Sequence, residues 1–356
     1  MCGLLSLAAG LCSCSGTADD GYEVTISADK DVIVADGTDA AAFTVLCNGE
    51  DVTASDAVSI VCISSGEESI LPAGTAAFST KTAGDYTFTA RYDTGSDIVE
   101  SSNSVKVSAQ EGAEPQDWYH TVLMMQFTSV GCINCPVMSS NLKLVQESMP
   151  ERMAIASFHV DYGGYGDPMT TSIGSMYMNR FSITGLPQCR TEMKQEHVSS
   201  ELEDLTGSVE NAVAENLPSA GISIESSFDT ESRQLDITLK VTSNVSKSYR
   251  YVIFLVEDGI EYMQLGADVS PYIHNNVVRA SRSANIYGER LEKGQSLFPG
   301  KEVTVDWSTG IEDGWNPDNM RIVAAVLDSE DGGTTYICDN AAVCQLGGSI
   351  GYKYNE

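Results

Sequence analysis

The pair Cys132 and Cys135 constrains this chain most, because it forms a Cys-x-x-Cys motif with Ile133 and Asn134 in between. An apolar run from Thr121 to Phe127 precedes the motif, and a helix-like stretch follows it. A CxxC pair between a strand and a helix is typical of a redox-active dithiol. We therefore expect an α/β region that places the pair at the start of a helix.

The two cysteines should differ in reactivity. Free backbone N–H groups and the helix dipole favour an anion at a helix N-terminus, so Cys132 should ionise more easily than Cys135. Cysteines in this setting have a pKa of roughly 3.5–7.5, against about 8.5 for an ordinary thiol. Cys132 is expected to attack or be attacked, and Cys135 to resolve the mixed disulfide. Pro136 suits a first helical turn, where no N–H is needed.

Strand and helix signals alternate from about residue 118 to residue 218, which predicts an α/β domain. We expect strands at 121–127 and 153–160 and helices at 137–149, 172–181 and 201–216. Between the helices expected at 172–181 and 201–216, a short apolar segment ends at Pro187, and a further strand is expected after it. This order resembles the thioredoxin-like fold. The resemblance implies that Pro187 is cis and shapes a groove in which a peptide strand can pair.

β-structure is expected on both sides of this domain. From residue 22 to residue 109, short runs of Val, Ile, Thr, Phe and Tyr alternate with Gly, Asn and Asp turns. They resemble bacterial immunoglobulin-like modules and predict a sandwich, expected to act as a spacer more than as a binding module. Residues 110–117 are predicted to form a linker. Residues 219–356 return to strand signals and predict a C-terminal β-sandwich. The expected fold class is thus multidomain.

The first residues are expected to target the protein for export. Leu4 to Leu11 form an apolar stretch too short to span a bilayer, so we expect a lipoprotein signal peptide at 1–13. Leu11-Cys12-Ser13-Cys14 resembles a bacterial lipobox, which makes Cys14 the expected lipidation site and residues 14–21 a tether. Cys12 is the alternative anchor. A plain secretory signal with unmodified cysteines is the alternative for the whole segment.

Export allows disulfides to persist among the remaining cysteines. Proximity in sequence suggests Cys47 with Cys62 and Cys338 with Cys344, although connectivity cannot be deduced from sequence and buried free thiols are the alternative. Cys189 is left over. It either borders the redox site or is an inert buried thiol.

Charge and ligand types exclude other classes of function. The net charge of −30, with only 20 Lys and Arg, argues against nucleic-acid binding and favours a solvated exterior. A metal site would combine the CxxC pair with Met124, Met125, Met138 or His159. No second CxxC and no paired histidines at ligand spacing are present, so we expect no metal, and thiol exchange needs no dissociable cofactor.

The segment Val122 to Pro136 resembles the thioredoxin-like outer membrane lipoproteins, a family called after its twenty-eight-kilodalton member. His274 to Arg279 and Val303 to Trp307 resemble segments of the same family, and the likeness covers about Trp118 to Gly348. It implies a thioredoxin-like fold, a β-rich C-terminal region and a bacterial outer membrane location, on the periplasmic or the cell-surface face. His274 and Arg279 are interpreted as a loop histidine and a surface ion pair; binding an anion or contacting the redox domain is the alternative.

Two functions remain at this stage. The first is thiol-disulfide exchange with protein thiols or disulfides, by Cys132, Cys135 and Pro187, on a protein held to the membrane by its lipid anchor. The second is a noncatalytic cell-surface binding protein or scaffold in which the CxxC disulfide is structural. Gly131 stands where familiar redox thioredoxins have Trp, and Ile133-Asn134 replaces their Gly-Pro, so the direction of electron transfer stays open.

Overall fold

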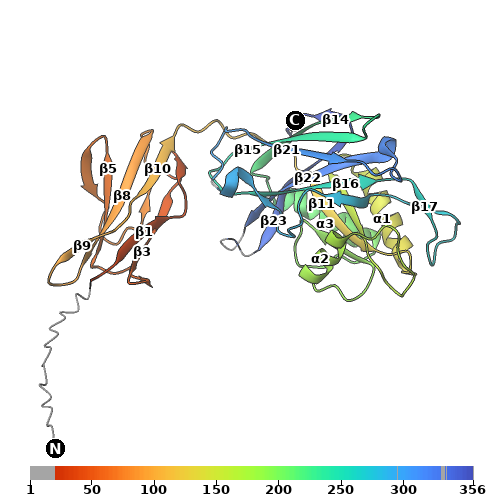
Figure 1. Cartoon of the computed structure of the whole chain (residues 1–356), viewed down its shortest axis with the longest axis horizontal. Coiled ribbons are helices and arrows are strands. Elements are labelled where there is room, and N and C mark those ends of the chain that lie inside the picture. Colours follow the sequence, from red (N-terminus) through yellow and green to blue (C-terminus); the bar gives the residue numbers. More distant parts are fainter. Residues whose placement is uncertain (1–20, 295, 330–332, 334, 356) are drawn as a thin grey trace, which may run out of the picture. The chain divides into compact units, whose positions relative to one another are not determined.

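The computed structural model describes residues 21–294, 296–329, 333 and 335–355. Figure 1 shows that β-strands dominate these residues and that few helices accompany them. The described chain divides into two compact units. One unit holds residues 21–29, 42–77 and 86–106, and the other holds residues 30–41, 78–85 and 107–355. The protein is therefore multidomain and built mostly of β-sheet.

Residues 24–110 form two β-sheets in which most neighbouring strands are antiparallel. The first contains β1 (Val24–Ala28), β3 (Ala41–Cys47), β4 (Glu50–Asp51) and β7 (Ala77–Phe78). The second contains β2 (Val32–Val34), β10 (Val105–Gln110), β8 (Gly84–Asp93), β5 (Val58–Ser64), β6 (Glu67–Ile70) and β9 (Ile98–Glu100). Side chains of β3 alternate between buried and exposed, as in a strand that covers a core with one face. The rings of Phe43 and Phe88 join the two sheets, with centroids 4.5 Å apart.

The larger unit is organised by an eight-stranded sheet with the strand order β13-β11-β12-β19-β16-β22-β23 and with β20 beside β16. Its strands are β11 (Val122–Thr128), β12 (Met153–His159), β13 (Gln188–Thr191), β16 (Arg250–Glu257), β19 (Val277–Ser281), β20 (Glu289–Arg290), β22 (Met320–Ser329) and β23 (Tyr336–Gln345). β11 and β12 are parallel, and β13 pairs antiparallel with β11. The remaining neighbours of β16 and β22 are antiparallel.

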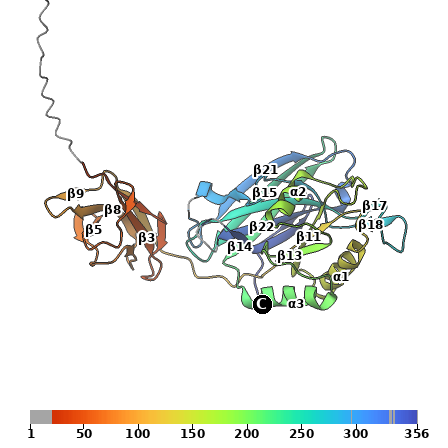
Figure 2. The same ribbon diagram turned by 90° about the horizontal axis from the view of Figure 1, so that it is seen from below.

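Three α-helices cover this sheet: α1 (Cys135–Ser148), α2 (Ser172–Arg180) and α3 (Leu202–Glu215). Figure 2 shows α1 and α3 side by side. Val122 and Met124 of β11 pack with these two helices, whereas Leu123 and Phe127 point to the opposite face, where α2 packs. Because both faces are covered, every residue of β11 is buried, which explains its continuous apolar sequence.

A second sheet covers the C-terminal half of the first. It has the order β21-β15-β14-β24 and consists of β14 (Ala220–Asp229), β15 (Gln234–Ser243), β21 (Val303–Gly310) and β24 (Ser349–Ile350). Alternate residues of β16 divide between two cores. Ile253 packs toward this second sheet, and Phe254 packs toward Tyr177 of α2, with ring centroids 6.2 Å apart.

The boundary expected at residue 218 does not separate two independent sheets. β11, β12 and β13 lie before it and β16, β19, β22 and β23 lie after it, yet all belong to the eight-stranded sheet. The junction is the parallel pairing of β12 with β19, at Ser157 and Val277. The sequence signals of the individual strands were correct, but they carry no information on which strands share a sheet. The C-terminal β-strands therefore complete the sheet that the CxxC strand begins.

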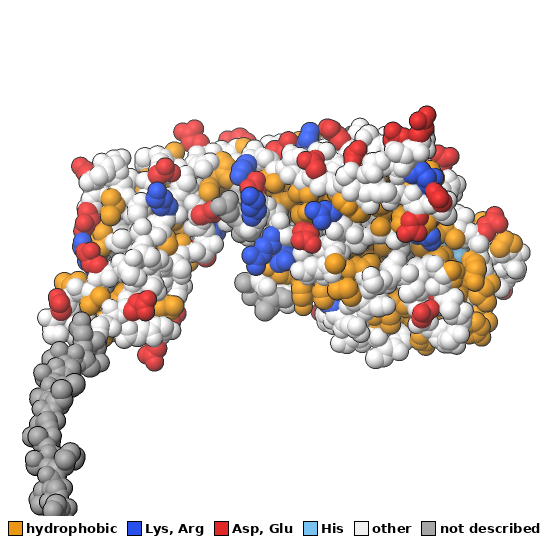
Figure 3. All heavy atoms as spheres, viewed as in Figure 1, with side chains coloured by type: hydrophobic (Ala, Val, Ile, Leu, Met, Phe, Trp, Pro, Cys, Tyr) orange, Lys and Arg blue, Asp and Glu red, His pale blue; other side chains and the backbone are white. Residues whose placement is uncertain are grey.

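Charged side chains lie scattered over the face of the molecule in Figure 3, with acidic groups more numerous than basic ones. This dispersal fits the solvated exterior expected from the net charge of −30. Within the described residues, no helix has the length and apolar composition needed to cross a bilayer. The expected signal peptide, lipidation site Cys14 and most of the tether lie outside the described residues.

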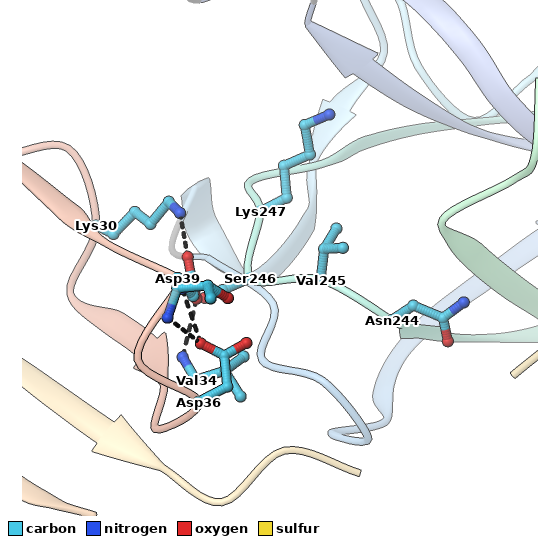
Figure 4. Close-up of a pocket in the computed structure, with 9 residues that line it drawn as sticks. Lys30, Val34, Asp36, Asp39, Asn244, Val245, Ser246 and Lys247 are labelled. Carbon is cyan, nitrogen blue, oxygen red and sulfur yellow. Dashed lines mark hydrogen bonds and ion pairs between the residues drawn. The ribbon is translucent and has the colours of Figure 1, made fainter. Parts of the chain in front are cut away.

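Asp39 organises the turn after β2 (Figure 4). One carboxylate oxygen accepts a 2.8 Å hydrogen bond from the backbone N–H of Val34, and the other pairs with the ammonium group of Lys30. The backbone N–H of Asp39 itself donates to Asp36 over 2.8 Å, as in an Asx turn. This network fixes the segment locally and explains the charged residues that line the pocket drawn there.

Candidate redox site

Cys132 and Cys135 form a disulfide with an S–S distance of 2.11 Å and a Cα–Cα distance of 5.4 Å. The pair lies where β11 leads into α1, because α1 begins at Cys135 and Pro136 occupies its first turn. Asn134 precedes the helix without a side-chain cap. The first-turn N–H groups therefore have no capping side chain, a setting that stabilises negative charge on a nearby sulfur. Cys135 is fully buried, and Cys132 is only 3% exposed.

Gly131 has no room for a side chain. A Cβ atom at this position would lie 2.4 Å from the backbone oxygen of Tyr162 and 2.7 Å from the ring of Tyr165. Both distances are far shorter than any van der Waals contact. The loop that follows β12 thus occupies the space beside the CxxC pair, and this contact explains why a glycine precedes Cys132.

Pro187 lies at the start of the edge strand β13. The Leu186–Pro187 peptide bond is cis, as the sequence resemblance implied, and Pro187 is partly exposed. The next residue, Gln188, pairs with Phe127 of β11, five positions before Cys132. The structure therefore places Pro187 next to a residue that pairs with the strand preceding the CxxC motif.

A loop from the C-terminal region lies against the turn that contains Cys132. Residues 263–271, here called the cover loop, connect β17 (Ile260–Tyr262) with β18 (Tyr272–His274). The side-chain amide of Gln264 donates to the backbone oxygen of Cys132 over 2.9 Å and to that of Ser129 over 3.2 Å. The backbone N–H of Leu265 donates to the oxygen of Val130 over 2.9 Å. These bonds tie the loop to the turn that contains the first cysteine.

Gly266 brings the cover loop into direct contact with the CxxC dipeptide. Its φ of +80° favours glycine, and an added Cβ would lie 2.1 Å from the backbone oxygen of Ile133. The side chain of Ile133 itself remains 61% exposed. The loop therefore covers the backbone around Cys132 and leaves an apolar side chain of the motif in solvent. No signal in the sequence pointed to this loop.

Two buried histidines lie beside the turn after β11. His159 Nδ1 lies 2.7 Å from Asp167 Oδ2, and the same oxygen accepts the N–H of Val130 over 2.9 Å. Burial raises the pKa of Asp167, but the bonds from His159 and Val130 outweigh it and leave the pKa lowered. The ring of His274 lies 5.1 Å from that of His159. Burial and the neighbouring His159 lower the pKa of His274 to about 4.

His274 therefore lies against His159 of β12, a strand of the region that contains the CxxC motif. A contact with this region was the alternative expected from the sequence. Arg279, at the other end of the His274–Arg279 segment, makes different contacts. It forms an ion pair with Glu257 at 3.3 Å, and its guanidinium lies 5.1 Å from the ring centre of Trp315. Both groups are largely buried, so this is an interior ion pair rather than the surface pair expected.

The pairs suggested for the other cysteines do not form. Cys47, Cys62, Cys189, Cys338 and Cys344 are all buried and free. Cys47 lies on β3 and Cys62 on β5, in different sheets. Burial raises the pKa of Cys189 to about 12, so this thiol is inert rather than part of the redox site.

A β-bulge separates Cys338 from Cys344 although both lie on β23. The register of β22 and β23 shifts where Val326 pairs with Asn340 and Leu327 with Cys338, so Asp339 has no partner across the ladder. Because of this extra residue, side chains before and after Asp339 that would otherwise lie on the same face of the sheet lie on opposite faces. Cys338 packs with the α2 side of the sheet, and Cys344 packs with the four-stranded sheet.

The three methionines considered as metal ligands belong to the apolar core, and His159 is bonded to Asp167. Met124 of β11 and Met138 of α1 are fully buried in the core that α1 and α3 share with the sheet, and Met125 is buried on the opposite face. Within the described part of the chain, no cluster of His, Cys, Asp or Glu has a geometry that would hold a metal ion.

Residues 174–341 match the family described as Outer membrane protein Omp28. The matched range contains the His274–Arg279 and Val303–Trp307 segments but not the CxxC motif. The match supports the resemblance to this outer membrane family over the C-terminal half of the chain. It is consistent with an outer membrane location. None of the curated proteins matches the chain.

Solved structures add a likeness in fold. The chain is similar to HBP35 of Porphyromonas gingivalis, with a TM-score of 0.54 and 15% identity over 65% of this chain and 77% of that one. A domain of the outer membrane lipoprotein Omp28 from Porphyromonas gingivalis has 17% identity, covers 37% of this chain and 90% of its own, and has a TM-score of 0.25. A protein from Agrobacterium tumefaciens, AGR_C_4864, has 13% identity, covers 67% and 99%, and has a TM-score of 0.45.

Proposed function

We propose that the protein is a lipid-anchored outer membrane protein that exchanges disulfides with other proteins through Cys132 and Cys135. The observation that carries the proposal is the disulfide at the junction of β11 and α1, with Cys132 before the uncapped first turn of the helix. Residues 118–218, with α1, α2 and α3 around β11, β12 and β13, form the thioredoxin-like part. Residues 22–109 form an immunoglobulin-like spacer between the acylated Cys14 and this part.

The exchange begins from the oxidised pair. A substrate thiolate attacks the sulfur of Cys132, a mixed disulfide forms, and the Cys132–Cys135 bond breaks with Cys135 leaving as a thiolate. A second substrate thiolate then attacks the substrate sulfur and releases Cys132 as a thiolate. The substrate gains a disulfide and the pair becomes two thiols. In the reverse direction Cys132 attacks a substrate disulfide, and Cys135 resolves the intermediate.

Access to Cys132 requires the cover loop to move. The sulfur-bearing residue is 3% exposed, and Gln264 and Leu265 hold the loop on the backbone that surrounds it. An incoming polypeptide would displace these contacts and pair beside Pro187, ahead of Cys189, whose outer side Val198 already bridges. The exposed side chain of Ile133 offers an apolar contact for such a substrate.

The second candidate is a noncatalytic surface lipoprotein in which the disulfide is structural. The observation that favours it is the same burial of Cys132, since structural disulfides resist attack by thiols that cannot reach them. In that case the β-rich region would serve as a scaffold or bind a partner, and the cover loop would stay closed.

The reduction potential of the Cys132–Cys135 pair distinguishes the two functions. It is measured on the soluble chain from residue 21, by equilibration with glutathione or dithiothreitol followed by thiol trapping. A value between roughly −120 and −270 mV supports exchange, and a value below about −300 mV supports a structural disulfide. The variant Cys135→Ser should accumulate mixed disulfides with protein partners if the pair exchanges, because the resolving thiol is absent.

A further inference from the structure

A large cavity separate from the disulfide lies between α1 and the β18–β19 region. It has a volume of about 800 Å³. Its floor carries Gln126 of β11 and His159 of β12, and α1 contributes Ser139 and Lys143. The opposite wall carries Tyr272 and His274 of β18 and Arg321 of β22, and the end of the cover loop completes it. We call this cavity the α1–β18 cleft.

The cleft lies next to the place where β12 and β19 pair, at Ser157 and Val277. The hairpin of β17 and β18 lies beside α1 (Figures 1 and 2). The polar side chains of the floor form a chain of hydrogen bonds: Ser157 donates to Gln126, and Gln126 donates to Ser139, both over 2.8 Å.

Two buried polar atoms of lining residues have no hydrogen-bond partner. They are Nε2 of His274, a residue that is 5% exposed, and Nε of Arg321. Burying such atoms without a partner costs free energy. The Nη2 group of Arg321 donates to Asp258 and Asn276, at 2.8 and 2.7 Å. The Nε–H donor of the same side chain has no partner. An arginine Nε–H can pair only with a hydrogen-bond acceptor.

The charges of the cleft favour an anion. Lys143 and Arg321 are its cations and Asp258 is its only carboxylate among the lining residues. Asp258 Oδ1 already accepts both Arg321 and the backbone N–H of Asn276. Lys143 is 70% exposed and has a distant partner, Glu147, at 3.8 Å. In a chain with 50 acidic and 20 basic side chains, the lining of the cleft therefore carries a local excess of one positive charge, that of Lys143.

We propose that the α1–β18 cleft binds a small organic carboxylate whose hydroxyl or amide groups meet the polar floor. Arg321 and Lys143 hold the carboxylate, and Gln126 and Ser139 bond to the neighbouring polar groups. The ring of Tyr272 packs against the carbon skeleton. A sugar acid and the C-terminal end of a short peptide share this chemistry, and both fit a volume of about 800 Å³.

Isothermal titration calorimetry of the soluble chain from residue 21 tests the proposal with matched probes. The probes are sodium glucuronate with glucose as its neutral counterpart, and alanylalanine with its amide as the uncharged counterpart. At least one acid should bind about tenfold or more tightly than its neutral counterpart, the range expected for hydrogen bonds to a charged group. Binding of glucuronate alone identifies a sugar acid, and binding of alanylalanine alone identifies a peptide end.

Variants locate the binding. Lys143→Glu should weaken the acid about tenfold or more, and it changes an exposed side chain that the fold does not need. Lys106→Glu is the matched control, because Lys106 is an exposed lysine on β10 that does not line the cleft, and this variant should leave binding unchanged. Equal affinity for acids and neutral probes, no binding by either acid, or full affinity in Lys143→Glu would overturn the proposal.

Discussion

The side-chain amide of Gln264 lies 2.9 Å from the backbone oxygen of Cys132, and so a residue 132 positions further along the chain closes over the first cysteine. The same amide donates to the oxygens of Ser129 and Leu265. One side chain thus holds the cover loop on the CxxC turn. The rate at which a reductant reaches the disulfide should therefore depend on Gln264.

Gln264→Ala should speed the reduction of the disulfide. Loss of the amide removes hydrogen bonds worth about 0.5–1.5 kcal/mol each, which predicts an increase of roughly two- to tenfold in the rate with dithiothreitol. The rate is measured by quenching with a maleimide and counting modified thiols by mass. Gln345→Ala, on the exposed end of β23, is the control and should react at the parent rate. An unchanged rate in Gln264→Ala would show that the loop does not limit access.

Gly131→Ala should destabilise the fold. The added methyl group would meet the Tyr162 backbone oxygen at 2.4 Å, and overpacking of this kind costs about 1–3 kcal/mol. Chemical denaturation should show a lower midpoint with an unchanged slope. Gly185→Ala serves as the control, because a Cβ added at Gly185 would have nothing within 4 Å. Equal stability of the two variants would contradict the close packing around Gly131.

His274 should make stability depend on pH between about 6.5 and 4. Its pKa is lowered to about 4 in the folded state, mainly by burial, so the unfolded chain binds the proton first as the pH falls. The neutral form therefore supports the fold above pH 6.5, and this contribution is lost progressively down to about pH 4. At about 1.4 kcal/mol per pKa unit the loss approaches roughly 3 kcal/mol.

Urea denaturation at several pH values measures that dependence. His274→Gln should flatten the curve between pH 6.5 and 4, whereas replacement of the exposed His197 by Gln should leave most of it. His159 and Asp167 face His274 and remain in place in both variants. A curve with the same slope in His274→Gln would exclude this histidine as its cause.

The thiols should separate into two groups on alkylation of the chain from residue 21. None of the five free cysteines should react while the protein is folded, since all are buried. All five should react in denaturant without reductant, and Cys132 and Cys135 should follow only after reduction. Intact mass gives the count at each stage. Fewer than five modifications in denaturant would mean that Cys47 and Cys62, or Cys338 and Cys344, are paired after all.

Periodic apolar segments made much of the CxxC region predictable. The strands and helices expected around Cys132 coincide with β11, α1, β12, α2 and α3 to within a few residues, because each is long enough to carry a clear burial pattern. The disulfide between Cys132 and Cys135 was predictable because the two residues are close in sequence. Gly131 was noted as a departure from other sequences, and the structure supplies its reason in the contact with Tyr162.

Contacts between distant segments escaped prediction. The cover loop contains Gly266 and Pro271 and no periodic pattern, so nothing in its residues indicated that it lies on Ile133. The shared sheet depends on the pairing of Ser157 with Val277, more than a hundred residues apart. Sequence proximity also misjudged Cys338 and Cys344, because a single bulged residue, Asp339, turns them toward opposite cores.

The eight-stranded sheet sets a limit on how this protein can be divided for study. A fragment that ends at residue 218 would carry β11, β12 and β13 but would expose the edge of β12 that β19 covers. It would also uncover the apolar residues of β11 that now pack against Phe254 and its neighbours. Bare strand edges and apolar faces promote association between chains. Cys132, Cys135 and the C-terminal strands are therefore one unit of expression and unfolding, although the sequence patterns predict a domain boundary between them.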